Sequence, residues 1–406
     1  MKVGLTYTAD ALNASVELEG SKSISNRLLI MRALSKSDFE IKHLSPSDDT
    51  QTLLALLKSD NIICDVGAAG TTMRFLTAFF ALQPGLRILT GSERMKKRPI
   101  HILVDALREL GAEIEYKEKE GFPPLKIEGK HLSANEVHIK ADVSSQYISA
   151  LMMIAPVLEN GLTLHLEGKL SSFPYISMTL RLMQSMGIEC SISENIISIA
   201  HGNYNAKNVH VEGDWSAASY YFSIVALSEN SRLRILGIDE NSLQGDAVLP
   251  QIYKQLGVTT NFNSGVCELQ QTGNITSYFD YDFSNCPDLA QTVVVTCAAL
   301  GIPGKFSGLE SLKIKETDRT NALATELKKF DVNFSAEGNS WILDGKISIK
   351  KNVEIETYED HRMAMCFAPL ALLQPIIICD KDVVKKSYPS FWDDLVSLDF
   401  TVSSIG

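Results

Sequence analysis

Six stretches of the chain share one order of polar and hydrophobic residues. Each begins with a short polar cluster, continues as an apolar run of helical length, and leads through a tight polar turn, often into an alternating run. Long apolar runs favour buried helices, and alternation favours half-buried strands. The pattern predicts helices over 22–34, 69–82, 144–157, 215–227, 287–300 and 359–372.

A second pattern alternates with the first. It is an amphipathic helix that ends at a turn residue and leads into a strand, and it covers 103–116, 180–192, 252–262 and 323–336. Its turn residues are Gly111, Gly187, Gly257 and Asp331. A glycine after the last helical turn usually adopts the left-handed conformation that stops a helix.

Together the two patterns predict an α/β fold of strand–helix units repeated about six times in two similar halves. Strand–helix alternation alone is common to α/β proteins, so the nearly regular spacing is what favours a true duplication. The boundary between the halves should lie near Gly213, after the strand-like run NVHVEG. No linker rich in Gly, Ser or Pro marks it, which predicts short hinge strands.

Composition narrows the class of protein. The chain has 406 residues, 45% hydrophobic and 21% charged, which is typical of folded domains. Its 38 basic and 49 acidic residues give a net charge of −11, which argues against nucleic acid as the main partner. Seven scattered cysteines without a C-x-x-C pair argue against a disulfide framework or a zinc site and favour reduced thiols.

No membrane segment is expected either. The first twenty residues contain no apolar run of the signal-peptide type, and the most apolar stretch, 363–379, is interrupted by Pro369, Gln374 and Pro375. The sequence therefore predicts a cytoplasmic protein.

Basic residues at the predicted helix starts need a separate explanation. Hydroxyl groups there cap free N–H groups, which would explain Ser216 and Thr71. The basic residues instead add positive charge where the helix dipole is already positive; they are Lys22, Arg27, Arg74 and Arg362. This arrangement favours a bound small polyanion.

Taken singly, each cluster also has a structural interpretation. The run GSKSISNR is a common kind of loop and lacks the spacing of a P-loop. Lys315 and Arg319, spaced as on a helix around Glu316 and Asp318, could be a surface network of salt bridges. His361 could be a buried core histidine. A role as a metal ligand is not expected, because no second His or Cys lies at metal-binding spacing from it.

In order and spacing, however, the clusters resemble the 5-enolpyruvylshikimate-3-phosphate synthase family over nearly the whole chain. The motifs are GSKSISNR, AGTTMR, RMKKRPI, SSQ, SFPYISMTL, CPDLAQT, KETDR, DHRMAMCF and KSYPSF. The resemblance implies an α/β fold (α+β in some schemes) of two similar domains, each with three βαβαββ units forming an inside-out α/β barrel, with the active site in the cleft between them. It implies one domain over 20–212 and another over 213–406 with 1–19 returning to it.

The resemblance also implies the reaction and the acceptor site. The enolpyruvyl group of phosphoenolpyruvate is moved to the 5-hydroxyl of shikimate 3-phosphate, through a tetrahedral intermediate, in the shikimate pathway. Shikimate 3-phosphate should be bound by Lys22, Ser23, Arg27, Ser144, Ser145, Gln146, Ser172, Tyr175, Asp288, Ser311 and Lys315. Hydroxyls and cations suit a phosphate, and the tyrosine can pack on the ring.

Phosphoenolpyruvate and the proton transfers are assigned in the same way. The residues that should bind phosphoenolpyruvate are Lys22, Gly70, Arg94, Gln146, Arg319, Arg362 and Lys386. Asp288, assisted by Lys22, is the candidate base, and Glu316 is the candidate acid for the methylene carbon. Glu316 lies beside Lys315 and Arg319, which should depress its pKa until bound anions neutralise them. No cofactor and no metal are expected, and the family pattern predicts a monomer.

The sequence departs from the family pattern at three positions. Ala68 replaces the usual Asn near phosphoenolpyruvate, Ser311 stands where Asn or His is common, and Ser177 replaces a frequent Asp.

Two other functions are alternatives to this interpretation. The related UDP-N-acetylglucosamine enolpyruvyl transferases have Lys-Asn where this chain has Lys22-Ser23, and they have a cysteine in the loop that corresponds to 91–100, which has none here. A two-lobed anion-binding protein without catalysis would have no use for Glu316.

Overall fold

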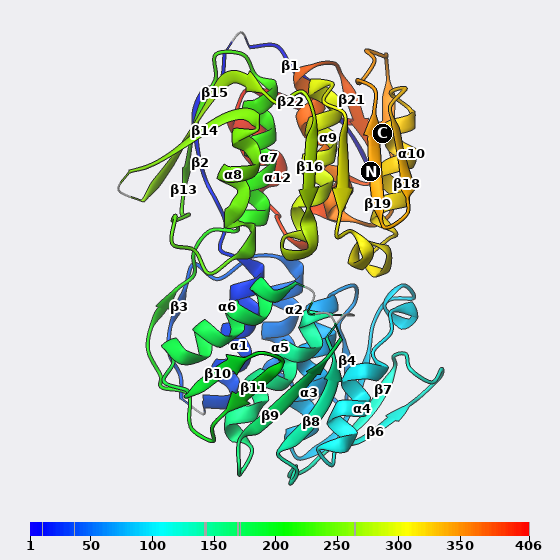
Figure 1. Cartoon of the computed structure of the whole chain (residues 1–406). Helices are drawn as coiled ribbons and strands as arrows, with labels where there is room; N and C mark the ends of the chain where they lie inside the picture. The colour runs from blue at the N-terminus through cyan, green and yellow to red at the C-terminus, as the bar shows by residue number, and fades with distance from the viewer. Residues whose placement is uncertain are drawn as a thin grey trace. The chain divides into compact units, whose positions relative to one another are not determined.

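The computed structural model describes residues 1–9, 11–35, 37–141, 144–168, 170, 172–263 and 265–405. The chain divides into two compact units (Figure 1). Unit 1 comprises Met1–Gly20 with Glu212–Gly406, and unit 2 comprises Ser21–Val211. The N-terminal segment is thus grouped with the C-terminal half of the chain.

Unit 2 alternates strands and helices along most of its length. Its elements are α1 (Lys22–Ser35), β3 (Ile41–Lys42), α2 (Asp48–Leu57), β4 (Ile63–Asp65), α3 (Gly70–Leu82), β5 (Gly85–Thr90), α4 (His101–Glu109), β6 (Glu113–Tyr116), β7 (Leu125–Gly129), β8 (Glu136–Lys140), α5 (Ser145–Ile154), β9 (Leu162–Glu167), α6 (Phe173–Ser185), β10 (Cys190–Ser193), β11 (Ile196–Ile199) and β12 (Val209–His210).

Unit 1 follows the same order. Its elements are β1 (Lys2–Tyr7), β2 (Asn13–Glu17), α7 (Trp215–Leu227), β13 (Arg232–Leu236), α8 (Leu249–Lys254), β14 (Leu256–Asn263), β15 (Val266–Ile275), β16 (Phe279–Asp282), α9 (Ala290–Leu300), β17 (Gly304–Ser307), α10 (Arg319–Lys328), β18 (Asn333–Glu337), β19 (Ser340–Asp344), β20 (Val353–Ile355), α11 (His361–Phe367), β21 (Ile376–Ile378), α12 (Phe391–Ser397) and β22 (Phe400–Ile405).

One sheet topology recurs in both units. In the sheet of β4, β5, β7 and β6, the first two strands pair in parallel and the last two form an antiparallel hairpin beside them. The sheets β8-β9-β11-β10, β16-β17-β19-β18 and β2-β13-β15-β14 repeat this pairing. The pairs β4–β5, β8–β9 and β16–β17 are each joined through one α-helix in the usual crossover manner, whereas the whole of unit 2 and α7 lie between β2 and β13 in the sequence. The result is the βαβαββ unit that the family resemblance implies.

The repeat at the chain ends is closed by the N-terminal strand. Strand β20 pairs in parallel with β21, and β1 lies between β21 and β22, antiparallel to both. Thus β1 takes the place that β7 or β11 takes elsewhere, which explains why Met1–Gly20 belongs to unit 1. In the described part of unit 2, the repeat that contains α1 and α2 is reduced to the two-stranded parallel pair β3–β12.

The helices predicted from long apolar runs are confirmed as α1, α3, α5, α7, α9 and α11. Helices α7 and α9 are buried nearly all round, as expected for helices without a polar face. Their few hydroxyls pair across the helix contact, Ser219 with Thr292 at 3.2 Å and Ser223 with Thr296 at 2.8 Å. No helix among the described residues combines the length and the apolar character needed to span a bilayer.

Three of the four predicted turn residues after the amphipathic helices are also confirmed. Gly111, Gly187 and Asp331 follow the ends of α4, α6 and α10 with φ values of 101°, 83° and 62°. Gly257 also has a positive φ, 85°, but it is the second residue of β14. A further stop at Asp399, with φ of 66° between α12 and β22, was not predicted.

Candidate active site

A buried arginine organises the charged groups of unit 1. Arg319 is the first residue of α10 and is 2% exposed. Its Nε lies 2.7 Å from Asp360 Oδ2, its Nη1 lies 3.0 Å from Asp288 Oδ1, and its Nη2 lies 2.9 Å from Glu316 Oε2. Burial by itself would lower the pKa of this guanidinium, but Asp360, Glu316 and Asp288 raise it, so Arg319 stays charged.

Three further cations surround the same carboxylates. Arg362 Nη2 lies 3.2 Å and Lys315 Nζ 3.9 Å from Asp288, while Lys386 Nζ lies 3.0 Å from Glu316 Oε1. These residues and Arg319 form four cations around three carboxylates, which we call the Arg319 cluster. Several cations held this close together suit an added anion.

Helix termini fix the geometry of this cluster. Asp360 is completely buried at the start of α11, where its side chain accepts the backbone N–H of Arg362. The same carboxylate holds Arg319, so one residue caps α11 and orients the guanidinium. The helical spacing suggested by the sequence for Lys315 and Arg319 is wrong, because α10 begins only at Arg319.

A second buried carboxylate lies on the α7 side of unit 1. Asp246 is 4% exposed and accepts a hydrogen bond from Ser216 Oγ, whereas Asp214 caps α7. The prediction that Ser216 is a cap is therefore wrong. Burial, followed by the charge of Asp288, raises the pKa of Asp246 to about 7, against the lowering effects of Ser216 and Arg362.

In unit 2 a buried cation has only neutral hydrogen-bond acceptors among the described residues. Arg27 in α1 is 2% exposed and donates to Thr179 Oγ1, Ser149 Oγ, and the carbonyls of Ser23 and Tyr175. All four acceptors are neutral, and burial lowers the pKa of Arg27 to about 10, so it remains positive near neutral pH. Because buried charges are usually paired, this site favours an anionic ligand.

The hydrogen-bond count leaves one donor of Arg27 for such a ligand. A guanidinium has about five N–H groups. Within the described chain, Nε and Nη2 are fully used and Nη1 makes one bond, to Ser23 O. The remaining N–H belongs to Nη1.

The starts of α1 and α5 carry the other predicted acceptor residues. Lys22 Nζ lies 3.5 Å from Asp49, whose side chain is 5% exposed. Ser144 caps α5 by accepting the N–H of Gln146, and Gln146 Nε2 donates to Thr71 Oγ1 at 3.1 Å. Thr71 therefore acts as an acceptor for Gln146 and not only as a helix-start residue.

The guanidinium of an arginine approaches Gly70 closely. A Cβ at this first residue of α3 would lie 2.5 Å from Arg98 Nη1. Arg94 lies in the same 91–99 segment and is partly exposed. The segment is tied to its surroundings by Arg74 Nη2 and Tyr147 Oη, which both donate to the carbonyl of Pro99.

The structure thus brings some predicted residues together within each unit. In unit 1 the Arg319 cluster unites Asp288, Lys315, Glu316, Arg319, Arg362 and Lys386. Ser311 lies in the 3-10 helix Glu310–Ile314 and bonds to none of them within the described chain. In unit 2 the residues lie at the starts of α1, α3, α5 and α6, with Ser172 at φ of 55° just before α6.

Asp49, Asp246 and Asp360 were missed by the sequence analysis as functional candidates. Each lies in a polar segment at a helix start, where aspartate is ordinarily a cap. Only burial and the cationic neighbours distinguish them, and neither is visible in the sequence.

The repeated βαβαββ topology defines a mixed α/β protein of two similar units. A family model described as EPSP synthase (3-phosphoshikimate 1-carboxyvinyltransferase) matches residues 6–59 and 55–395. A 3-phosphoshikimate 1-carboxyvinyltransferase of Bacteroides fragilis (strain YCH46) is 48% identical over 395 residues, covering 96% of each chain.

More distant relatives agree with this match. The enzyme of the same description from Vibrio vulnificus (strain YJ016) is 35% identical over 417 residues, covering 95% of this chain and 96% of the relative. The solved EPSP synthase of Acinetobacter baumannii has the same fold, with a TM-score of 0.79, 20% identity and complete coverage of both chains. The chain belongs to the EPSP synthase family, a family of transferases.

The raised pKa of Asp246 predicts a pH-dependent stability. Between about pH 4 and pH 7 the unfolded chain releases this proton while the folded chain keeps it, so Asp246 lowers stability as the pH rises through that range. Asp246→Asn keeps an acceptor for Ser216 and removes the charge. The free energy of unfolding, measured with urea, is compared between this variant and wild type. We expect the difference in favour of the variant to be about 2 kcal/mol larger at pH 8 than at pH 5.

Asp239→Asn is the matched control, because Asp239 is exposed and also accepts from a neighbouring backbone N–H. Its difference from wild type should be the same at both pH values. A flat profile for Asp246→Asn would show that this carboxyl is ionised at pH 5 in the folded protein.

Proposed function

We propose that the chain transfers the carboxyvinyl group of phosphoenolpyruvate to the 5-hydroxyl of shikimate 3-phosphate and releases phosphate. Membership of the EPSP synthase family carries the proposal. The Arg319 cluster supports it, since it combines several cations with carboxylates able to move protons.

Shikimate 3-phosphate is assigned to unit 2 groups with matching chemistry. The unpaired charge and remaining N–H of Arg27 suit an anionic group of this substrate. Lys22, Ser23, Ser144, Ser145 and Gln146 add a cation, hydroxyls and an amide at the starts of α1 and α5. Ser172 and Tyr175, at the start of α6, complete these contacts.

Lys315, Ser311 and Asp288 complete the acceptor site in the proposal. Asp288 is already held by Arg319 and Arg362, so its carboxylate is kept in a fixed position. It removes the proton of the 5-hydroxyl, with assistance from Lys22, and the hydroxyl oxygen attacks C2 of phosphoenolpyruvate.

Phosphoenolpyruvate is assigned to Arg94, Arg319, Arg362 and Lys386, with Lys22, Gln146 and the backbone of Gly70. Arginine matches phosphate and carboxylate oxygens with paired N–H groups, whereas lysine supplies a point charge. The side chains of Arg362 and Lys386 are 9% and 11% exposed, against 2% for Arg319, so a ligand reaches them more readily than it reaches Arg319.

Glu316 supplies the proton to the methylene carbon. Arg319 and Lys386 each hold one oxygen of this carboxylate and favour its charged form. An incoming phosphate or carboxylate competes for Lys386, and the loss of that contact makes protonation of Glu316 easier. The resulting tetrahedral ketal then loses phosphate while the new methyl group returns a proton, which restores the double bond.

The proposal extends to the cofactor requirement, the location and the oligomeric state of the protein. The chemistry above uses acid, base and charge stabilisation by this chain alone, so no cofactor is required. All seven cysteines carry free, buried thiols, which supports a reducing cytoplasmic location. A monomer is proposed from the family pattern.

Acceptor specificity tests the proposed reaction. Purified protein with phosphoenolpyruvate should release phosphate when shikimate 3-phosphate is added and not when UDP-N-acetylglucosamine is added, because Arg27 and Lys22-Ser23 fit the smaller phosphorylated acid. Phosphate release and the coupled carboxyvinyl product are measured together. Turnover with only the nucleotide sugar would contradict the assignment, as would the absence of turnover with either acceptor.

Glu316→Gln tests the proposed acid. The variant keeps the size and hydrogen-bond capacity of the side chain but cannot donate a carboxyl proton, so kcat should fall about 10²–10⁴-fold. The KM for phosphoenolpyruvate should not rise, because the cluster becomes more positive. Glu310→Gln, at an exposed site in the preceding 3-10 helix, is the matched control and should behave like wild type. A kcat of Glu316→Gln near that of wild type would refute the role.

A further inference from the structure

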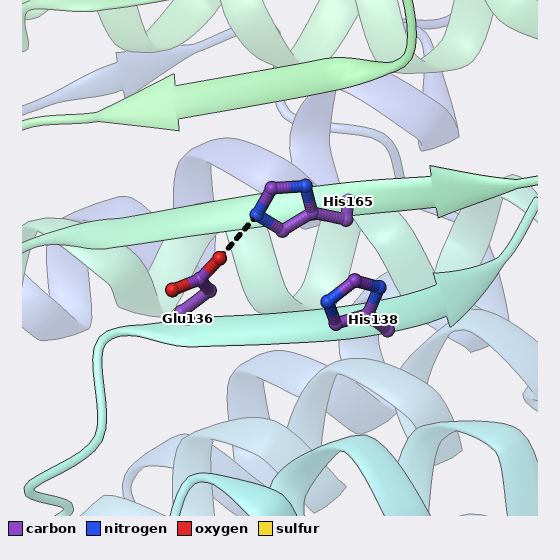
Figure 2. Close-up of side chains that lie close together, drawn as sticks. All are labelled: Glu136, His138 and His165. Carbon is purple, nitrogen blue, oxygen red and sulfur yellow. Dashed lines mark ion pairs between the residues drawn. The ribbon is translucent and has the colours of Figure 1, made fainter.

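Two histidines and a glutamate converge on one face of the sheet formed by β10, β11, β9 and β8 (Figure 2). Strands β8 and β9 pair in parallel, with His138 directly opposite His165. Glu136 lies two residues before His138, so its side chain points to the same face of the strand. The three side chains are partly or fully exposed, and each offers a metal-ligating atom within 4.8 Å of the others.

The contacts among them are close. The imidazole rings of His138 and His165 stack with centroids 4.6 Å apart and planes 13° apart. Glu136 Oε1 lies 2.6 Å from His165 Nε2, as the dashed line in Figure 2 marks. Bonds of about 2.0–2.2 Å from a zinc ion to nitrogen and oxygen ligands place neighbouring ligand atoms about 3.4 Å apart. The three ligand atoms, which lie within 4.8 Å of one another, would reach this spacing by side-chain rotation.

A fourth side chain orients one of the rings. His138 Nδ1 lies 3.4 Å from Glu167 Oε1, at the end of β9. When Nδ1 donates to this carboxylate, Nε2 of His138 keeps its lone pair for a ligand bond. A carboxylate behind a ligating histidine is the usual device for fixing its tautomer.

The charge of this face also favours a cation. Glu136 and Glu167 contribute two negative charges, and Lys140, which lies opposite Glu167 in the strand pairing, contributes one positive charge. With neutral imidazoles the face is net negative, and it presents two nitrogen ligands and one oxygen ligand on a rigid strand pair.

We propose that Glu136, His138 and His165 form a binding site for one divalent first-row transition-metal ion, of which Zn²⁺ is the probe. Imidazole and carboxylate are ligands that suit this class of ion, and three protein ligands leave a position for water. This site is independent of the proposed carboxyvinyl transfer and uses none of the residues assigned to it. The sequence motifs did not indicate this site, because pairing of β8 with β9 brings its ligands together.

A second group of similar composition is a poorer candidate. Glu354, Glu356 and Cys379 also lie within ligand distance of one another. However, Glu354 is paired with Lys2 at 2.7 Å, and burial, the largest cause, raises the pKa of the Cys379 thiol to about 11, so it resists the deprotonation that metal binding needs.

The test is a calorimetric titration of Zn²⁺ into the full-length protein without a histidine tag. Wild type should bind one Zn²⁺ per chain with micromolar or tighter affinity. His138→Asn and His165→Asn should each weaken binding more than about 10-fold, and Glu136→Gln should weaken it about 10-fold. No binding by wild type, or wild-type affinity in both histidine variants, would overturn the proposal.

The chain contains a matched control for the histidine pair. His43 and His210 also stack, with centroids 5.3 Å apart, but they belong to no three-ligand group among the described residues, and His43 Nδ1 contacts the carbonyl of Val211. His210→Asn should bind Zn²⁺ like wild type. An equal loss in His210→Asn would overturn the proposal, as would a loss confined to Cys379→Ser.

A measurement on wild type covers the case in which a variant does not fold. In protein labelled with ¹⁵N at histidine, one equivalent of Zn²⁺ should shift the ring signals of two of the eight histidines. These should be the signals that disappear in His138→Asn and His165→Asn, or in the corresponding glutamine variants. Shifts of other histidines alone would overturn the assignment.

Discussion

Positive charge held at helix starts is the constraint on which the rest of the structure depends. Arg319 begins α10 and is buried, and Arg27 lies in the first turns of α1 and is buried as well. The helix dipole adds to these charges instead of opposing them. Such groups are stable only when carboxylates or a bound anion compensate them, and the two units solve this problem differently.

Unit 1 compensates its cations internally. Three carboxylates share Arg319, and Asp360 couples that contact to the cap of α11. The clustered cations suit an anion, and the carboxylates are groups that can move protons. Among the described residues of unit 2, Arg27 donates to neutral oxygens from three helices, so a bound anion would compensate its charge. The repeated βαβ arrangement makes both solutions possible, since a helix start follows the first strand of parallel pairs such as β4–β5, β8–β9 and β20–β21.

Much of the fold could be predicted from the sequence. The apolar runs are long enough to separate helix from strand, and turn residues such as Gly111 and Gly187 mark the helix ends reliably. The reduced repeat around β3 and β12 was not expected, because a missing hairpin leaves no pattern to detect. The assignment of 1–19 to the second domain came from a family resemblance, and the position of β1 between β21 and β22 gives its physical reason.

The site was less predictable, because its contacts join distant residues. The segment KETDR indicated a charged site. Residue spacing could not show that α10 begins at Arg319, or that Arg319 bonds to Asp360, 41 residues away. The same holds for Arg27 with Ser149 and Thr179, and for His138 opposite His165, which depends on strand register. The roles of individual residues in substrate binding stay predictions.

The most direct test of this electrostatic account is a crystal structure of the protein soaked with shikimate 3-phosphate. The account predicts an anionic oxygen of the ligand within hydrogen-bond distance of Arg27 Nη1, with further contacts to Lys22 and the start of α5. A ligand bound away from these groups, with Arg27 still surrounded by neutral oxygens alone, would contradict it.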